Sequence, residues 1–91
     1  MPQNPSIICG LVVDSRGQPV VGARVFFIAG PVSLPDIAAL TDNHGGFRLS
    51  APAPGDYTLQ CIADGFFPTT VRTTVKSKES IQLTVELSRQ D

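Results

Sequence analysis

The stretch that most constrains the fold runs from Asp14 to Val25 and has the sequence DSRGQPVVGARV. Gly17 is free to take a positive φ, and Pro19 fixes φ just before the chain becomes extended. Gly22 gives a small-side-chain entry into the run that follows. Apolar runs flank this stretch on both sides, so we predict that it joins the first two strands of a β domain.

The composition supports an all-β chain. The 91 residues include eight glycines and eight prolines, which is above average usage and predicts many turns. A chain of this length can bury one hydrophobic core without a metal or a disulfide. We therefore expect one domain over residues 1–91, with an ordered core at about 6–88.

Seven short strands are predicted, separated by turns. Their expected bounds are 7–13, 22–29, 37–41, 47–50, 57–63, 66–75 and 81–87. The run at 37–41 has an alternative, a helical turn capped by Asp36. Pro68 suits an edge strand or a bulge and not a central position, because proline cannot donate to a sheet ladder. The spacing of the turns predicts a seven-stranded, two-sheet antiparallel sandwich of Ig-like architecture.

Alternation assigns an inward face to three of the strands. The side chains expected to face the core are Phe47 and Leu49; Tyr57, Leu59, Cys61 and Ala63; and Ile81, Leu83, Val85 and Leu87. Cys9 lies on the opposite face of its strand from Ile8 and Val12. If Ile8 and Val12 face the core, the sulfur of Cys9 points outward while that of Cys61 points inward, and both stay free thiols. Free thiols suit a reducing compartment.

Charge argues against two classes of partner. The net charge of −1 gives no electrostatic basis for binding nucleic acid or an anionic membrane. The basic cluster of Arg72, Lys76 and Lys78 is expected to be a solvated strand end.

The apolar run at 7–13 is too short for a signal peptide or a membrane span, so we expect no membrane insertion and a cytoplasmic location. Delivery to the cell surface by a dedicated apparatus stays open.

No residue pattern predicts catalysis, a cofactor or a metal. His44 is the single histidine, and it lies in a turn where no nucleophile is placed beside it. Asp42 with Asn43 supplies too few carboxylates for calcium, so Asp42 is expected to bond its own turn backbone. The other aspartates expected at turns have the same local role. Cys61 is expected to be buried and inert.

Apolar side chains exceed what one small core needs. The predicted partner interface consists of Phe26, Ile28, Pro31, Val32, Leu34 and Pro35. The outer face of the strand at 7–13 is also apolar. Contiguous exposed apolar surface marks interaction sites. The alternative is that the loop at 31–37 folds over the sheet and covers its neighbours.

Motifs along most of the chain resemble one family. They are Gly10-x-Val12-x-Asp14, Gly17-x-Pro19-Val20-x-Gly22-Ala23-x-Val25, Thr41-Asp42-x-x-Gly45 with Phe47, Pro54-Gly55-x-Tyr57-x-Leu59 and Ala63-x-Gly65-Phe66. This pattern resembles the carboxypeptidase regulatory-like domain, a transthyretin-like (prealbumin-type) β-sandwich. The resemblance implies an accessory module of the kind found beside peptidases, in surface proteins, in outer-membrane receptors and in secretion-spike extensions.

Two departures narrow what the resemblance implies. Related surface domains carry an isopeptide bond from a lysine in the first strand, and the run at 7–13 has no lysine. Transthyretin-like hydroxyisourate hydrolases use paired His and Arg residues and a Tyr-Arg-Gly-Ser end, which this chain lacks. Neither the crosslink nor that activity is expected.

The function expected from the sequence is a non-enzymatic protein-interaction module. One concrete form is an adaptor that docks on a larger assembly, such as a secretion or injection apparatus. The partner would be another protein or a second copy, held through an apolar face or an edge strand. The alternative is a carbohydrate- or cell-surface-binding module, which would need exposed Tyr or Trp, and the chain has no Trp.

Overall fold

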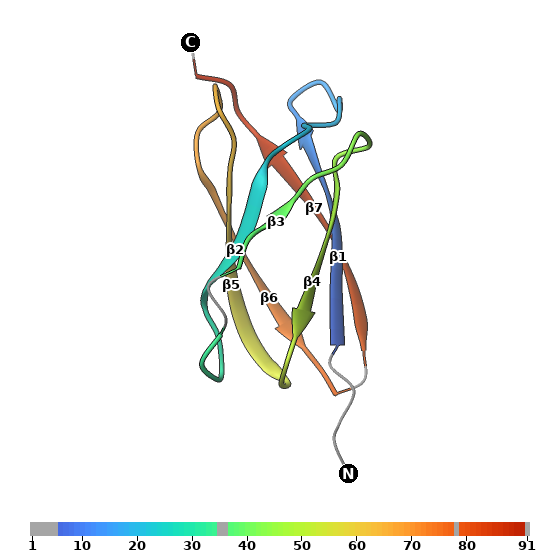
Figure 1. Ribbon diagram of the computed structural model, residues 1–91, viewed down its shortest axis with the longest axis vertical. Helices are drawn as coiled ribbons and strands as arrows, with labels where there is room; N and C mark the ends of the chain where they lie inside the picture. Colours follow the sequence, from blue (N-terminus) through green and yellow to red (C-terminus); the bar gives the residue numbers. More distant parts are fainter. Residues whose placement is uncertain (1–5, 35–36, 78, 91) are drawn as a thin grey trace.

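The computed structural model describes residues 6–34, 37–77 and 79–90, and this part folds into strands without a helix (Figure 1). The strands are β1 (Ser6–Asp14), β2 (Arg24–Ala29), β3 (Ala39–Leu40), β4 (Gly46–Ala51), β5 (Gly55–Ile62), β6 (Thr69–Val75) and β7 (Ser80–Leu87). They form two sheets. Sheet A has the order β4-β1-β7, and sheet B has the order β3-β2-β5-β6.

The predicted two-sheet, seven-stranded sandwich is confirmed, with one difference in strand direction. Four of the five strand pairs are antiparallel, but β1 and β7 run parallel from Ile7↔Ser80 to Asp14↔Leu87. The prediction of a wholly antiparallel sandwich is wrong at this pair. Side-chain alternation indicates which face is buried, but it carries no information on the direction of a neighbouring strand.

Three predicted strands are shorter than expected, and the one expected at 22–29 begins at Arg24. The strand expected at 66–75 begins at Thr69, because Pro68 has no N–H to donate and Phe66 instead bridges Arg89. The edge position expected from Pro68 is confirmed, since β6 is the last strand of sheet B. The strand expected at 37–41 is reduced to the two residues of β3. Asp36, the proposed cap of the alternative helical turn, lies outside the described residues.

The core lies between the sheets and receives side chains from both. Its buried members are Ile8, Val12, Val20, Ala23, Val25, Phe47, Leu49, Ala51, Tyr57, Leu59, Cys61, Val75, Val85 and Leu87. The inward faces predicted for β4, β5 and β7 are confirmed, although Ala63, Ile81 and Leu83 are only half-buried. Tyr57 is the largest fully buried side chain, and its ring lies 5.0 Å from the ring of Phe27.

Two of the four segments that cross between the sheets meet at Thr41. One runs from β1 to β2, and the other runs from β3 to β4. The buried Thr41 hydroxyl donates to the carbonyl oxygen of Val20 at 2.6 Å and accepts from the N–H of Ala23 at 2.9 Å. The Thr41 backbone also donates to Ala23 and accepts from Gly22. One residue of the second crossover therefore satisfies several polar groups of the first.

We expect replacement of Thr41 by valine to destabilise the fold. Thr41→Val keeps the shape but leaves the N–H of Ala23 and the carbonyl of Val20 without their side-chain partner. Burying unsatisfied polar groups lowers the free energy of unfolding by about 1–3 kcal/mol. Urea denaturation measures the change, with Thr84→Val as the control at an exposed position on β7. Equal stability of the two variants would contradict the role given to Thr41.

Candidate protein-binding surface

An apolar surface lies where β2 ends and the following loop begins. Its members come from the outer face of β2 and from the loop: Phe26, Ile28, Val32, Leu34 and Ile37, here named the loop-30 surface. Ile28, Val32 and Ile37 are 52%, 45% and 64% exposed. Together with neighbouring backbone, the surface encloses a groove of ≈ 360 Å³.

The loop that carries this surface is held against the core at its base. A Cβ atom at Gly30 would stand 2.8 Å from Cδ1 of Leu34 and 3.1 Å from the Tyr57 ring. Pro31 approaches Gly55 as closely, since a Cβ there would be 2.8 Å from the proline ring. Gly55 has a φ of 145°, which favours glycine. The close packing positions the loop without covering its apolar tips.

The sequence left open whether this region is an exposed interface or a loop that covers its neighbours, and different residues do each. Leu34 is half-buried and packs against the core, as a covering loop requires. Ile28 and Val32 stay exposed, as an interface requires. Pro31 is exposed, Phe26 is half-buried, and the structure brings both to this end of the molecule. Pro35 lies outside the described residues.

Sequence reasoning missed Ile37 as part of the surface. It assigned residue 37 to a strand, where alternation gave no reason to single it out. The chain pairs with β2 only at Arg24↔Leu40 and Val25↔Ala39, so Ile37 lies outside the ladder and is exposed. The signal available was a large aliphatic residue directly after a proline-containing loop.

The apolar outer face of β1 is a separate feature. Leu11 is 46% exposed, while Ile7, Cys9 and Val13 are half-buried. Since β1 belongs to sheet A and β2 to sheet B, their outer faces point to opposite sides of the sandwich. The two apolar faces do not combine into one patch.

A second hollow, of ≈ 410 Å³, lies at the opposite end of β2. Its walls mix apolar side chains with Arg24 and Asp64, which are both exposed. With one positive and one negative side chain at its rim, this hollow is suited neither to binding an anion nor to burying an apolar side chain of a partner. The residues that line the loop-30 groove are all apolar in type and carry no charge, although most of the surface exposed inside the groove comes from polar backbone atoms.

Asp42 has the local role predicted for it. Its Oδ1 accepts from the N–H groups of His44 and Gly46, each at 2.9 Å. These bonds, with Gly46 first, lower the pKa of the Asp42 carboxyl. His44 is exposed in the same turn, as expected. Within the described ranges no group of three His, Cys, Asp or Glu residues is placed to hold a metal.

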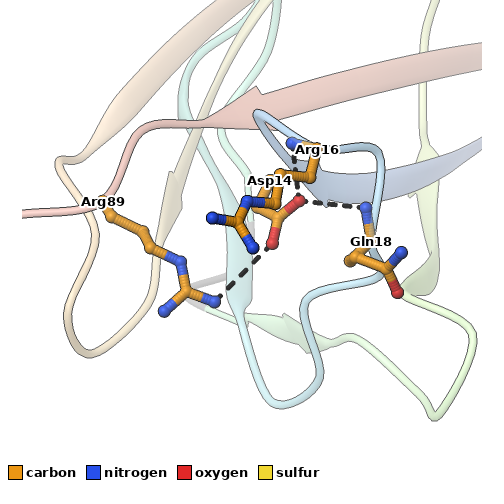
Figure 2. Close-up of polar contacts among 4 residues, drawn as sticks. All are labelled: Asp14, Arg16, Gln18 and Arg89. Atoms are coloured by element: carbon orange, nitrogen blue, oxygen red, sulfur yellow. Dashed lines mark hydrogen bonds and ion pairs between the residues drawn. The ribbon is translucent and has the colours of Figure 1, made fainter.

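Asp14 closes the turn that follows β1 (Figure 2). Its Oδ1 accepts from the N–H groups of Gln18 and Arg16, each at 2.9 Å, and its Oδ2 lies 3.6 Å from the guanidinium of Arg89. The bond from Gln18 contributes most to lowering the pKa of this carboxyl. The sequence predicted the turn, but not the contact with Arg89, which comes from the far end of the chain.

The two cysteines are free thiols, as predicted. Cys61 is buried, and burial raises the pKa of its thiol to about 11. It is therefore a protonated core residue and not a nucleophile at neutral pH. Cys9 lies on the outer face of β1. The residues that the structure describes include no helix that is long and apolar enough to span a membrane.

The two-sheet arrangement defines an Ig-like β-sandwich, and the sequence places the chain in one family. The model of the carboxypeptidase regulatory-like domain matches residues 7–88, so the chain belongs to this family. No curated protein sequence gives a significant match.

Solved structures with this fold come from proteins of several classes. A chain of a type II cohesin–X-dockerin complex from Acetivibrio cellulolyticus has a TM-score of 0.72 and 14% identity over 94% of this chain. The minor pilin of Streptococcus agalactiae has a TM-score of 0.73 and 20% identity over 100% of this chain. The 3-chlorocatechol 1,2-dioxygenase of Rhodococcus opacus has a TM-score of 0.70 and 15% identity over 97% of this chain. This chain spans 59%, 47% and 61% of those chains. At such identities the likeness shows the fold alone.

The two turn carboxylates predict an acid-sensitive fold. Asp14 and Asp42 have a lowered pKa in the folded chain, so their stabilising contribution is present above the unfolded pKa of about 3.9 and is lost as the pH falls through the folded pKa. The melting temperature should fall steeply below about pH 4. In Asp14→Asn combined with Asp42→Asn, the acid slope should be shallower, because these two positions no longer carry a charge that titrates. Parallel curves for both proteins would contradict this assignment.

Proposed function

We propose that this chain is a non-catalytic module that binds another protein through the loop-30 surface and so docks on a larger assembly. The observation that carries the proposal is the exposure of three apolar side chains, Ile28, Val32 and Ile37, around one groove. Exposed apolar side chains gathered at one place mark interaction sites, because water is released when a partner covers them.

The loop is held in place before a partner binds, which favours binding. Packing of Gly30 against Leu34 and Tyr57, and of Pro31 against Gly55, restrains the loop before a partner arrives. A restrained surface loses less conformational entropy on association than a disordered one. The groove is therefore ready to receive apolar side chains of a partner.

The polar groups of the chain support a role without catalysis. Asp14 and Asp42 accept backbone hydrogen bonds in their own turns, and Cys61 is protonated in the core. His44 is solvent-exposed, and no nucleophile hydrogen-bonds to it among the described residues. An acid–base or nucleophilic mechanism needs such groups side by side.

A protein partner is better supported than a carbohydrate. Sugar rings stack on exposed Tyr or Trp, but Tyr57 is 1% exposed and its hydroxyl donates to the carbonyl of Ala53 at 2.6 Å. Two solved structures with this fold belong to a cohesin–dockerin complex and to a pilin. A secretion or injection apparatus is the concrete form of assembly that we propose. An edge strand is a further contact open to such a module.

Charge introduced into the groove should abolish partner binding. The variant Ile28→Asp, Val32→Asp places two carboxylates where the partner's apolar side chains would be buried. We expect capture of the partner from a lysate of the source organism to weaken at least about tenfold, since burying one such side chain contributes roughly 1.5–3 kcal/mol. A photoreactive residue introduced at Val32 or Ile37 should crosslink to the partner, as detected by mass spectrometry.

The matched control replaces exposed apolar residues elsewhere. Val21 and Phe67 are 58% and 54% exposed and lie outside the loop-30 surface. The variant Val21→Asp, Phe67→Asp should capture the same partner as the unmodified chain. Equal loss in both variants, or no loss in either, would sink the proposed docking surface. Circular dichroism confirms that each variant is folded.

A further inference from the structure

The flank of the sandwich formed by β6 and β7 has two open edges. β6 ends sheet B and pairs only with β5, from Cys61↔Thr69 to Gly55↔Val75. β7 ends sheet A and pairs only with β1. Along β6 and β7 themselves, no other strand in the described part of the chain pairs with the outer edge. Just beyond them, at one end of the flank, the N–H of Phe67 donates to Ser88 and the N–H of Gln90 donates to Gly65. Open edges present N–H and C=O groups that can pair with another chain.

Apolar side chains at this flank are incompletely covered. Val71 on β6 and Ile81 and Leu83 on β7 face inward but stay half-buried. The inward side chains of β4, the edge strand of sheet A at the other flank, are all buried. An added strand along the open flank would therefore remove apolar surface from water as well as pair backbone groups.

Each of the two open strands carries a single charge, and the charges are opposite. Arg72 is the one charged residue in β6, and Glu86 is the one charged residue in β7. Both are exposed on the outer faces of their sheets. Neither forms an ion pair with any residue that the structure describes. Asp56, close to Arg72 on the same face, accepts a hydrogen bond from Thr74.

These charges distinguish between the ways in which two copies can pair. Full antiparallel overlap of β6 with β6 of a second copy puts Arg72 opposite Arg72, and like charges directly opposite are destabilising. Pairing of β6 with β7 of a second copy brings Arg72 near Glu86 instead. Opposite or diagonal neighbours across a strand pair are both within reach of such long side chains.

We propose that two copies of this chain associate flank to flank, with β6 of each copy antiparallel to β7 of the other and Arg72 beside Glu86. β6 and β7 run in opposite directions within one copy (Figure 1), so a two-fold axis parallel to the strands makes both new pairs antiparallel. Each resulting sheet is continuous and contains four strands from one copy and three from the other. The interface uses no residue of the loop-30 surface, so it goes beyond the docking role proposed above.

Charge reversal with sedimentation velocity tests this dimer. The unmodified chain should shift from monomer to dimer as its concentration rises. Arg72→Glu alone and Glu86→Arg alone should each weaken dimerisation about tenfold, because two pairs per dimer change from attractive to repulsive. The combined variant should restore it. Arg48→Glu, at an exposed position on β4, is the matched control and should leave it unchanged.

Several results would overturn the proposal. They are a monomer at every concentration, a combined variant that stays as weak as the single ones, and equal weakening by Arg48→Glu. Loss of the dimer in Ile28→Asp, Val32→Asp with retention in Arg72→Glu would place self-association on the loop-30 surface. Hydrogen exchange gives a second measurement, since amides of β6 should exchange more slowly as the dimer forms. Partner capture is also measured with Arg72→Glu. If this variant loses the dimer but still captures the partner, failure of the dimer and failure of the docking role can be told apart.

Discussion

The hydroxyl of Thr41 connects two of the four chain segments that cross between the sheets. Each segment leaves one sheet and enters the other, so each must place polar backbone at the edge of the core. Thr41 satisfies Val20 and Ala23 of the first crossover while belonging to the second. Asp14 and Asp42 then close the turns on either side with their own carboxylates. Because these bonds hold the crossovers, the strands that enter and leave them are fixed in register.

Local chemistry made much of the fold predictable. Alternation assigned the inward faces, and turn residues located the strands within a few positions. Pro68 indicated an edge strand from the sequence alone, because a missing N–H excludes a central place in a sheet. The parallel pairing of β1 with β7 was not predictable in this way. It joins residues far apart in the chain, and the alternation of β7 is the same whichever way its neighbour runs.

The candidate surface was predicted only in part, for a related reason. Phe26, Ile28, Val32 and Leu34 were identifiable as more apolar than one core requires. Whether a side chain in a loop is covered depends on the distance between loop and sheet, which composition does not specify. In the folded chain that distance is set by Gly30 and Gly55, where the backbone leaves room only for a hydrogen atom. With the loop this close to the sheet, Leu34 packs against the core while Val32 stays exposed.

The loop-30 surface and the β6–β7 flank have different physical requirements, which allows one chain to use both. The first is apolar and sits at the end of β2, while the second runs along two strands and depends on paired backbone and one charge of each sign. In the proposed dimer the two-fold axis is parallel to the strands, so both loop-30 surfaces lie at the same end. A partner assembly that repeats its binding site would then be held at two points. The second contact would form at the effective concentration set by the first, which raises the overall affinity without any new contact.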